Sequence, residues 1–304
     1  MKTIGIIGLG AIGMRHARNL IAMGHAVRGY DPAERPIGEF GIDWVESPRD
    51  LEGVDGFIIS SPPYRHVDDL YYTLGQPTLI EKPIATTEYD YAVMMENSRH
   101  YLPFNNVYVG CNQRFHPCVQ EAKRDIGYGA IGEVISASFV VAQKTEKPPY
   151  LRDGVTLNWG AHEVDLALFL LGPGKMEQPC INKEDTVAWI RISHQGVPSA
   201  VFMDYLTETP HRSFKIDGTK GSIFANLERF EYYTTYGNSA KIETLPGSMD
   251  QTYVDEMQAF ILASDGYLSP WLATGNDGLA VLRIILDAKF TRNGQAAIEW
   301  MLRP

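Results

Sequence analysis

At 304 residues, with 44% hydrophobic and 21% charged residues, the chain has the composition of an ordinary globular protein and the length of two domains. Its net charge of −10 argues against nucleic acid as a partner, and no apolar run reaches the ~20 residues that a membrane-spanning helix needs. Three cysteines without a C-x-x-C pair, and a first strand that leaves no room for a signal peptide, predict a reduced, cytoplasmic protein.

The chain opens with a glycine-rich turn between a predicted strand, residues 3–7, and a helix that begins near residue 11. Gly8, Gly10 and Gly13 have the spacing G-x-G-x-x-G. In a dinucleotide site the first glycine allows the tight turn, the second lets a pyrophosphate approach, and the third lets the helix pack closely. The helix N-terminus attracts the phosphates. The residues predicted to border the cofactor here are Gly8, Gly10, Ala11, Ile12 and Gly13.

A second predicted strand, residues 26–30, leads into an acidic residue that indicates which dinucleotide binds. Asp31 lies 18 residues after Gly13, where a carboxylate accepts hydrogen bonds from the adenine-ribose hydroxyls. The same carboxylate would repel the 2′-phosphate of NADP. Arg35 is a complication, because it could swing toward such a phosphate. We therefore predict NAD as the cofactor, with NADP the less favoured alternative.

The rest of the first 118 residues alternates strands with helices. Buried strands are predicted at 56–60, 77–81 and 106–112, with helices at about 65–75 and 86–100. This alternation indicates a parallel sheet with helices on both faces. We therefore assign residues 1–118 to a dinucleotide-binding domain, a doubly wound α/β sheet of the Rossmann type.

Past residue 118 the pattern becomes rich in strands. A helix at 119–127 and an alternating strand at 133–143 precede an apolar helix at 156–172. Five or six strand-like runs separated by turns then favour a mostly antiparallel sheet, and two helices close the chain. We assign residues 119–304 to an α+β domain on an open sheet, for substrate binding and oligomerisation, with closing helices that can pack back on the first domain.

Five segments in chain order carry a resemblance to a known family: GLGAIG at 8–13, SSPPYRH at 60–66, EKP at 81–83, NQRF at 112–115 and NWGAHEVD at 158–165. Together they resemble the Gfo/Idh/MocA oxidoreductases, the family of glucose–fructose oxidoreductase and inositol dehydrogenase, over the whole chain. The resemblance implies NAD(P)-dependent hydride transfer between nicotinamide and the hydroxyl or carbonyl group of a sugar, nucleotide sugar or cyclitol.

Lys82 follows a strand that would end where the nicotinamide lies. An ammonium group there would stabilise the alkoxide that develops as a carbinol carbon gives up its hydride. Glu81 is a candidate partner that orients Lys82. The other interpretation is a surface lysine before a turn-forming proline. The resemblance decides for a catalytic Lys82.

Three polar residues interrupt the apolar helix predicted at 156–172. Asn158, His162 and Asp165 are spaced i, i+4 and i+7, share one helix face, and need partners if buried. We interpret this face as a substrate pocket with His162 as general acid/base, and a structural histidine network is the alternative. In the family that the chain resembles, position 158 is commonly Asp. An amide cannot raise the basicity of His162, so Asp165 is the candidate for that charge. The second histidine of an H-E-x-x-H zinc motif is absent, and we expect no metal.

Other residues are predicted at the two halves of the site. Asn112 ends a strand and would line the nicotinamide side, as its family counterpart does. Arg114 either reaches the substrate or pairs with an acid. Tyr150, in the loop before the apolar helix, either contacts substrate or is solvated. His66 is interpreted as structural. The remaining residues predicted to contact the cofactor are Ser61, Pro62, Glu81 and Lys82.

Two other functions compete with a dehydrogenase. One is the reduction of a non-sugar carbonyl or enone, as distant relatives perform. The other is a dinucleotide-binding regulator without catalysis, against which the presence of Lys82 and His162 argues and which only Asn158 supports. A flavin or S-adenosylmethionine protein could share the glycine turn, but neither explains Lys82.

The second sheet is predicted to mediate self-association. Its runs at 200–206 and 230–236 carry aromatic and aliphatic side chains, and an open sheet needs cover. We expect a homodimer or homotetramer formed through this sheet. The other expected partner is a small-molecule sugar or polyol, with no nucleic acid and no membrane.

Overall fold

The computed structural model describes residues 1–33, 41–100, 104–145, 154–237 and 239–301, with the backbone alone at 97–100 and 292–301. The chain divides into two compact units. The first unit contains Met1–Asn112 and Met249–Leu279, and the second contains Gln113–Ser248 and Ala280–Pro304. The chain thus leaves the first unit six residues before the boundary predicted at 118, and it returns to that unit at Met249.

The first unit is built on a seven-stranded sheet whose order is β15-β6-β5-β4-β1-β2-β3. All neighbours are parallel except β15 and β6. The central strands are apolar at nearly every position and buried on both faces, because helices cover both sides of a parallel sheet. The strands are β1 (Thr3–Ile7), β2 (Ala26–Tyr30), β3 (Ile42–Trp44), β4 (Gly56–Ile59), β5 (Thr78–Glu81), β6 (Val107–Gly110) and β15 (Ala273–Thr274).

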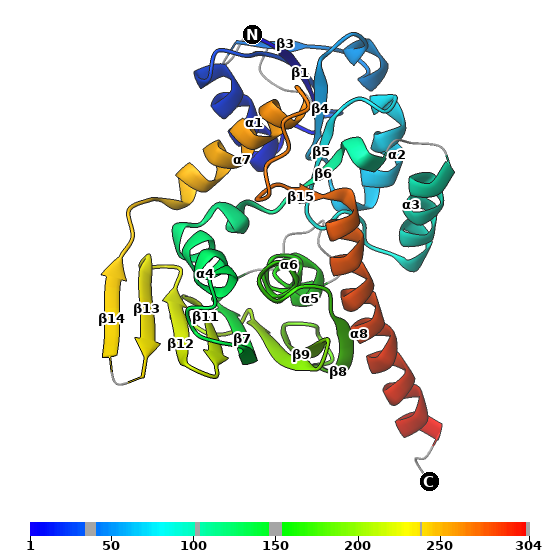
Figure 1. Cartoon of the computed structure of the whole chain (residues 1–304). Coiled ribbons are helices and arrows are strands. Elements are labelled where there is room, and N and C mark those ends of the chain that lie inside the picture. The colour runs from blue at the N-terminus through cyan, green and yellow to red at the C-terminus, as the bar shows by residue number, and fades with distance from the viewer. Residues whose placement is uncertain (34–40, 101–103, 146–153, 238, 302–304) are drawn as a thin grey trace. The chain divides into compact units, whose positions relative to one another are not determined.

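Helices α1 and α7 lie on one side of this sheet, and α2 and α3 lie on the other (Figure 1). The strand order reverses between β1 and β4, so the turns that follow these two strands lie side by side at the carboxyl edge. The predicted doubly wound fold is therefore confirmed. The helices are α1 (Ala11–Ala22), α2 (His66–Leu70), α3 (Glu88–His100) and α7 (Met249–Ala263), with 3-10 turns η1 (Pro48–Leu51), η2 (Pro63–Arg65), η3 (Tyr71–Thr73) and η4 (Phe104–Asn106).

The second unit is built on an eight-stranded open sheet whose order is β14-β13-β12-β11-β7-β10-β9-β8. The pair β7 and β10 is parallel and the other pairs are antiparallel, as predicted for the second domain. The strands are β7 (Val134–Ala142), β8 (Lys175–Ile181), β9 (Val187–His194), β10 (Val197–Asp204), β11 (His211–Gly218), β12 (Gly221–Asn226), β13 (Glu231–Tyr236) and β14 (Ser239–Thr244).

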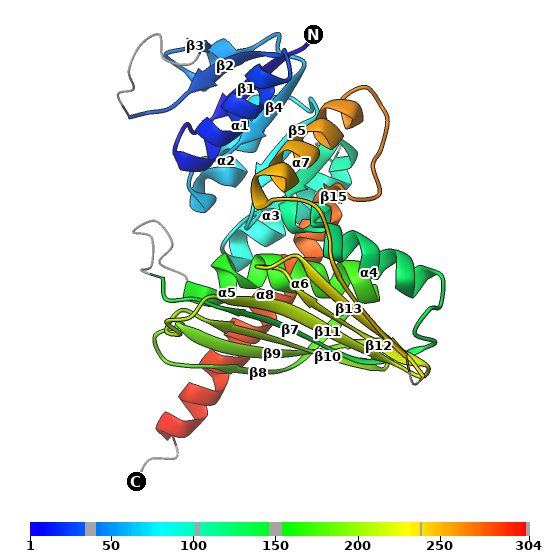
Figure 2. The same ribbon diagram turned by 90° about the vertical axis from the view of Figure 1, so that its left-hand side faces the viewer.

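Helices α4, α5 and α6 lie along one face of this sheet (Figure 2). The single helix predicted at 156–172 was wrong at Trp159, which separates α5 from α6. Gly160 follows at once, and a Cβ there would lie 3.0 Å from the sulfur of Met203, so glycine, a poor helix former, lets the helix pack closely on Met203. The bounds are α4 (Pro117–Gly127), α5 (Gly154–Asn158), α6 (Gly160–Leu171) and the 3-10 turn η5 (Asn112–Phe115).

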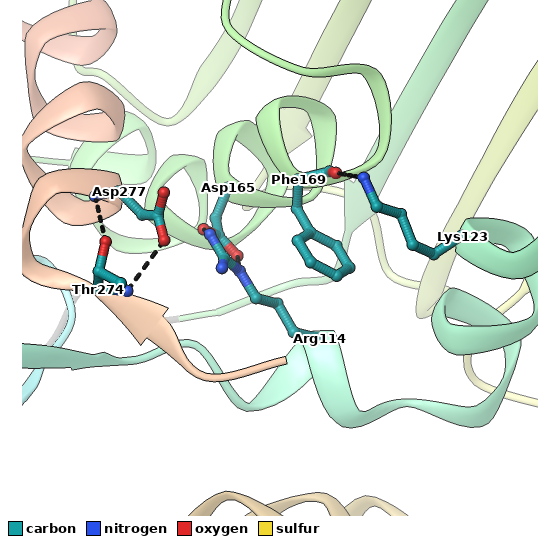
Figure 3. A network of polar contacts seen from close by, with 6 residues as sticks. All are labelled: Arg114, Lys123, Asp165, Phe169, Thr274 and Asp277. Carbon is teal, nitrogen blue, oxygen red and sulfur yellow. Dashed lines mark hydrogen bonds and ion pairs between the residues drawn. The ribbon is translucent and has the colours of Figure 1, made fainter. Parts of the chain in front are cut away.

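Helix α8 (Gly275–Met301) begins with a reciprocal cap. The Thr274 amide donates to the Asp277 carboxylate at 2.9 Å, and the Asp277 amide donates to Thr274 Oγ1 at 3.2 Å (Figure 3). Within the part of the chain that the structure describes, no helix has both the length and the apolar character of a membrane span.

Candidate functional site

The three glycines of the first turn are needed for different reasons. Gly8 has a φ of +90°, and a Cβ there would clash with the backbone of Ser61. A Cβ on Gly13 would clash with the carbonyl oxygen of Gly8. Gly10 is different, because its φ is −67° and a Cβ would meet no atom within 4 Å. The protein's own packing thus requires the first and third glycines, whereas a glycine at position 10 keeps open the space above the turn.

The space beside Gly10 has the properties of an anion site. Gly10 is the N-cap of α1 and has no side chain with which to cap the first N–H groups, and the first turn of α1 holds no acidic residue. The neighbouring turn after β4 is fixed to the glycine turn, because Ser60 Oγ donates to the Gly8 carbonyl at 2.7 Å. Next to it, Ser61 and Pro62 are half-exposed, so a ligand bound at the glycine turn could contact them.

Asp31 is held against the glycine turn. One carboxylate oxygen accepts from the amide of Leu9 at 2.7 Å, and the other accepts from the amide of Ala33 at 2.9 Å. The acid singled out by its distance in sequence from Gly13 therefore lies at the end of β2, beside the turn. Arg35, which could compete for the same ligand group, lies outside the described residues.

Glu81 closes β5 with its carboxylate turned inward. His16 Nε2 lies 2.7 Å from Glu81 Oε1, and the Lys82 amide donates to Oε2 at 3.3 Å. A Cβ on Gly110 would lie 3.0 Å from the same carboxylate, so the adjacent strand makes room for it. Burial raises the pKa of Glu81, but the hydrogen bond from His16 and the charges of His16, Lys82 and His66 outweigh it and hold this pKa below its usual value. Glu81 is thus a buried carboxylate beside half-buried Lys82.

His66 joins the two turns that follow β4 and β5. Its Nε2 lies 2.9 Å from the Ser61 carbonyl, and its Nδ1 lies 3.0 Å from the Pro83 carbonyl. Burial lowers the pKa of His66, while the two carbonyls and the carboxylates of Glu81 and Asp69 oppose this effect. His66, interpreted from sequence as structural, therefore connects two segments that were predicted to border the cofactor.

Asn112 follows β6 and is held by helix α7. Its Nδ2 donates to Thr252 Oγ1 at 2.8 Å, and Thr252 Oγ1 donates to the Met249 carbonyl at 2.6 Å. Asn112 is 2% exposed. This contact fixes the orientation of the amide at the carboxyl edge of the sheet.

In the second unit, Asn158 is oriented by a tyrosine. Asn158 Nδ2 donates to the Tyr205 hydroxyl at 2.6 Å, and the Trp159 ring meets the Tyr205 ring edge-on at 4.6 Å. Burial raises the pKa of Tyr205 to about 12, so the hydroxyl stays protonated. His162 lies one helical turn further along and is 9% exposed. The amide of Asn158 is therefore already held by a neutral partner.

Asp165 and Arg114 bind one another in a buried, two-pronged ion pair. Arg114 Nε lies 2.9 Å from Asp165 Oδ2, and a terminal guanidinium nitrogen lies 2.6 Å from Oδ1 (Figure 3). The guanidinium also lies 4.7 Å from the centroid of Phe169, and Lys123 donates to the Phe169 carbonyl. Burial and the charge of Arg114 lower the pKa of Lys123. Of the two interpretations of Arg114, the structure contains the acid pair, and the charge of Asp165 is balanced within it.

A second buried ion pair holds the same helix. Glu163, next to His162, binds Arg212 of β11, and the two side chains are 1% and 13% exposed. Burial raises the pKa of Glu163, and the charge of Arg212 opposes it. Helix α6 is thus fixed about its axis by one ion pair on each side of His162.

Two further predictions concern Tyr150 and metal ions. Tyr150 lies outside the described residues. Among those that are described, no group of three or more His, Cys, Asp and Glu side chains could hold a metal ion.

No protein-family model matches the sequence, and no curated protein matches it significantly. Solved structures do match. An oxidoreductase from Agrobacterium radiobacter, in complex with NAD+, L-tartaric acid and magnesium, is 21% identical over 95% of each chain, with a TM-score of 0.82. Levoglucosan dehydrogenase, in complex with NADH and levoglucosan, is 19% identical over 95% of this chain and 97% of that one, with a TM-score of 0.82. A myo-inositol dehydrogenase from Corynebacterium glutamicum is 20% identical over 97% of each chain, with a TM-score of 0.79.

The chain shares its fold with these oxidoreductases. Two residues of the site within this fold were missed from sequence. His16 lies three residues after Gly13 on the buried face of α1, and a histidine on the apolar face of an amphipathic helix was a signal for it. Tyr205 lies 47 residues from its partner Asn158, and no sequence pattern joins the two.

Proposed function

We propose that this protein is an NAD-dependent oxidoreductase that transfers a hydride between nicotinamide and a CH–OH or carbonyl group of a sugar, nucleotide sugar or cyclitol. The observation that carries the proposal is the glycine turn, where Gly10 keeps space open that the protein itself does not fill. The Gfo/Idh/MocA fold and neighbours solved with NAD+ or NADH support it. When bound, NAD would supply the carbon that accepts the hydride.

The first unit offers suitable groups for each part of NAD. The N–H groups at the start of α1 would receive the pyrophosphate, and Asp31 would accept hydrogen bonds from the adenine-ribose hydroxyls. On the nicotinamide side we place Asn112, whose amide is already fixed by Thr252. The residues that would complete the cofactor site are Gly8, Gly10, Ala11, Ile12, Gly13, Ser61, Pro62, Glu81 and Lys82.

Lys82 and His162 have separate roles in the proposed reaction. The ammonium of Lys82 stabilises negative charge on the reacting oxygen, and His162 takes up or returns its proton. Asn158, with its amide fixed by Tyr205, orients a substrate hydroxyl. Arg114 and Asp165 contribute to substrate binding as an ion pair, and Tyr150 is proposed as a further substrate contact.

Substituting Gly10 tests the proposal directly. Gly10→Val should leave thermal stability near that of the wild type, because the backbone angles suit any residue and a Cβ there meets no protein atom within 4 Å. It should weaken NADH binding, measured by fluorescence titration, at least about tenfold, because the side chain would occupy the place of the pyrophosphate.

Gly127→Ala is a matched control, because a Cβ at Gly127 also meets no atom within 4 Å but lies at the end of α4 in the second unit. This variant should bind NADH like the wild type. Equal NADH affinity in Gly10→Val and the wild type would show that the ligand does not lie on the glycine turn.

Asp31 should make the protein prefer NAD to NADP. Both of its carboxylate oxygens are fixed by backbone amides, so the charge cannot turn away from a 2′-phosphate. We expect NADH to bind more tightly than NADPH. The substitution Asp31→Ser should reduce the difference between the two affinities. Tighter NADPH binding in the wild type, measured by the same titration, would contradict this assignment.

The second sheet is the proposed surface for a homodimer or homotetramer. Side chains alternate along β10, where Val201 and Met203 are buried and Phe202 points to the face away from α4–α6. Phe202 pairs across the strands with Trp189 and Val140, both of them half-buried. These three side chains form an apolar row on the open face of the sheet.

Sedimentation velocity at micromolar concentration tests this association. We expect the wild type to sediment as a dimer or tetramer and Phe202→Lys to shift it toward monomer, because a charge would have to be buried in the contact. A wild-type protein that is monomeric throughout would refute the proposed interface.

We propose the cytoplasm as the site of action. The support is that both Cys111 and Cys118 are buried free thiols, and that burial raises the pKa of Cys118 to about 12, which makes this thiol unreactive.

A further inference from the structure

The buried contact between His16 and Glu81 links the cofactor helix to the strand that carries Lys82. His16 lies on α1, the helix whose N-terminus forms part of the glycine turn, and its side chain is fully buried. Its Nε2 lies 2.7 Å from Glu81 Oε1. Its Nδ1 is buried and has no hydrogen-bond partner among the residues that the structure describes. The bond to Glu81 is therefore the polar contact that balances the cost of burying the imidazole.

The direction of this hydrogen bond follows from the partner. An ionised carboxylate can only accept, so the proton lies on Nε2 and His16 donates to Glu81. The second carboxylate oxygen accepts from the Lys82 amide at 3.3 Å, and Gly110 leaves room for both oxygens. The donors fix the plane of the carboxylate at the end of β5.

The charged groups that face Glu81 come from several elements. His16 faces it from α1, Lys82 follows it in the chain, and His66 lies at the start of α2. Tyr253 of α7 packs edge-on against the His16 ring at 6.3 Å, and burial, together with the negative charge of Glu81, raises the pKa of this tyrosine. The charge of Lys82 thus acts on Glu81 together with those of His16 and His66.

We propose that His16 is a positioning residue, which fixes the orientation of the Glu81 carboxylate so that Glu81 holds the Lys82 side chain in place for hydride transfer. This inference rests on the role proposed for Lys82. Without the donor from His16, the Glu81 carboxylate is free to turn away from Lys82. Its negative charge then stabilises the ammonium less, and Lys82 loses its proton at a lower pH.

The experiment compares two substitutions that differ only in the donor. His16→Gln places an amide N–H near the position of Nε2, whereas His16→Leu fills a similar volume without a donor. All lysines are reductively methylated with a ¹³C label, and the Lys82 signal is assigned from its loss in Lys82→Arg. The Lys82 titration midpoint is then read by NMR in the full chain, without cofactor or substrate.

We expect the midpoint in His16→Leu to lie at least about one pH unit below that of the wild type, and the midpoint in His16→Gln to stay close to it. Glu81→Gln should lower the midpoint as His16→Leu does, and it provides the comparison if His16→Leu does not fold. Equal midpoints in the wild type, His16→Leu and Glu81→Gln would overturn the inference.

The positioning role of His16 and the proposed function can be rejected independently of one another. NADH affinity is measured on the same samples by fluorescence. If the wild type does not bind NADH, the proposed function is wrong whatever the lysine signals show. If NADH binds but the midpoints do not differ, the positioning role of His16 alone is wrong.

Discussion

Replacing Lys82 with alanine should lower kcat about a hundredfold or more on an identified substrate, with NADH affinity nearly unchanged. The ammonium acts on charge that develops in the transition state, so its loss is felt in the rate and not in ground-state binding. Steady-state kinetics and NADH titration measure the two effects separately. Lys82→Met should behave like Lys82→Ala, because it keeps the length of the side chain and removes the charge.

The matched control is Lys144→Ala, in which an exposed lysine is removed from a surface pair with Glu208. This variant should keep the wild-type kcat. Normal turnover by Lys82→Ala would show that the catalytic residue has been misplaced.

His162→Ala tests, with the same kinetic measurements, which residue exchanges the proton. It should lower kcat and flatten the dependence of the rate on pH near neutrality, because the group proposed to exchange the proton is lost. Asn158 donates to Tyr205 and carries no charge, so it does not raise the basicity of His162. Asn158→Asp should therefore move the pH inflection of the wild-type rate upward.

Replacing Asp165 with alanine should destabilise the protein by about 3–5 kcal/mol, the cost of leaving one member of a buried ion pair without its partner. Arg114 is 5% exposed in its side chain and binds Asp165 through two nitrogens, so water cannot readily replace the carboxylate. Urea unfolding at neutral pH measures the change in the free energy of unfolding.

Two controls separate this effect from ordinary loss of charge. Glu208→Ala removes the acid of an exposed pair, with side chains 64% and 76% exposed, and should change stability little. The double variant Arg114→Met, Asp165→Leu removes both charges and should recover much of the stability that Asp165→Ala loses. A single variant as stable as the wild type would contradict the buried pair.

The parallel sheet could be predicted because its signals are local. Each central strand is a short apolar run, and the turn after β1 is marked by glycines whose spacing has a steric cause. Asp31 was predicted to bind the cofactor from its distance to Gly13, and the structure places it against Leu9 of that turn.

The break between α5 and α6 could not be predicted in this way. The apolar pattern continues through Trp159, so nothing in the hydrophobic spacing marks the interruption. Partners far apart in the sequence were missed for the same reason. His16 and Glu81 are 65 residues apart, and Asn158 and Tyr205 are 47 apart, so their pairing depends on the fold rather than on spacing.

The spacing of Asn158, His162 and Asp165 indicated a shared polar face but not what each residue binds. In the structure, Asn158 donates to Tyr205, and Asp165 forms an ion pair with Arg114. Sequence alone left open whether Arg114 pairs with an acid, because its partner Asp165 lies 51 residues away on α6.

The most direct test of the central claim is the transfer of deuterium from carbon-deuterated sugars, nucleotide sugars and cyclitols to NAD+, followed by mass spectrometry of the recovered cofactor. The proposed function predicts deuterated NADH from at least one of these compounds with the wild type, and a transfer rate lower by about a hundredfold with Lys82→Ala. Tight NAD+ binding without deuterium transfer from any of them would contradict hydride transfer to this substrate class, and a dinucleotide-binding regulator would then be the better account.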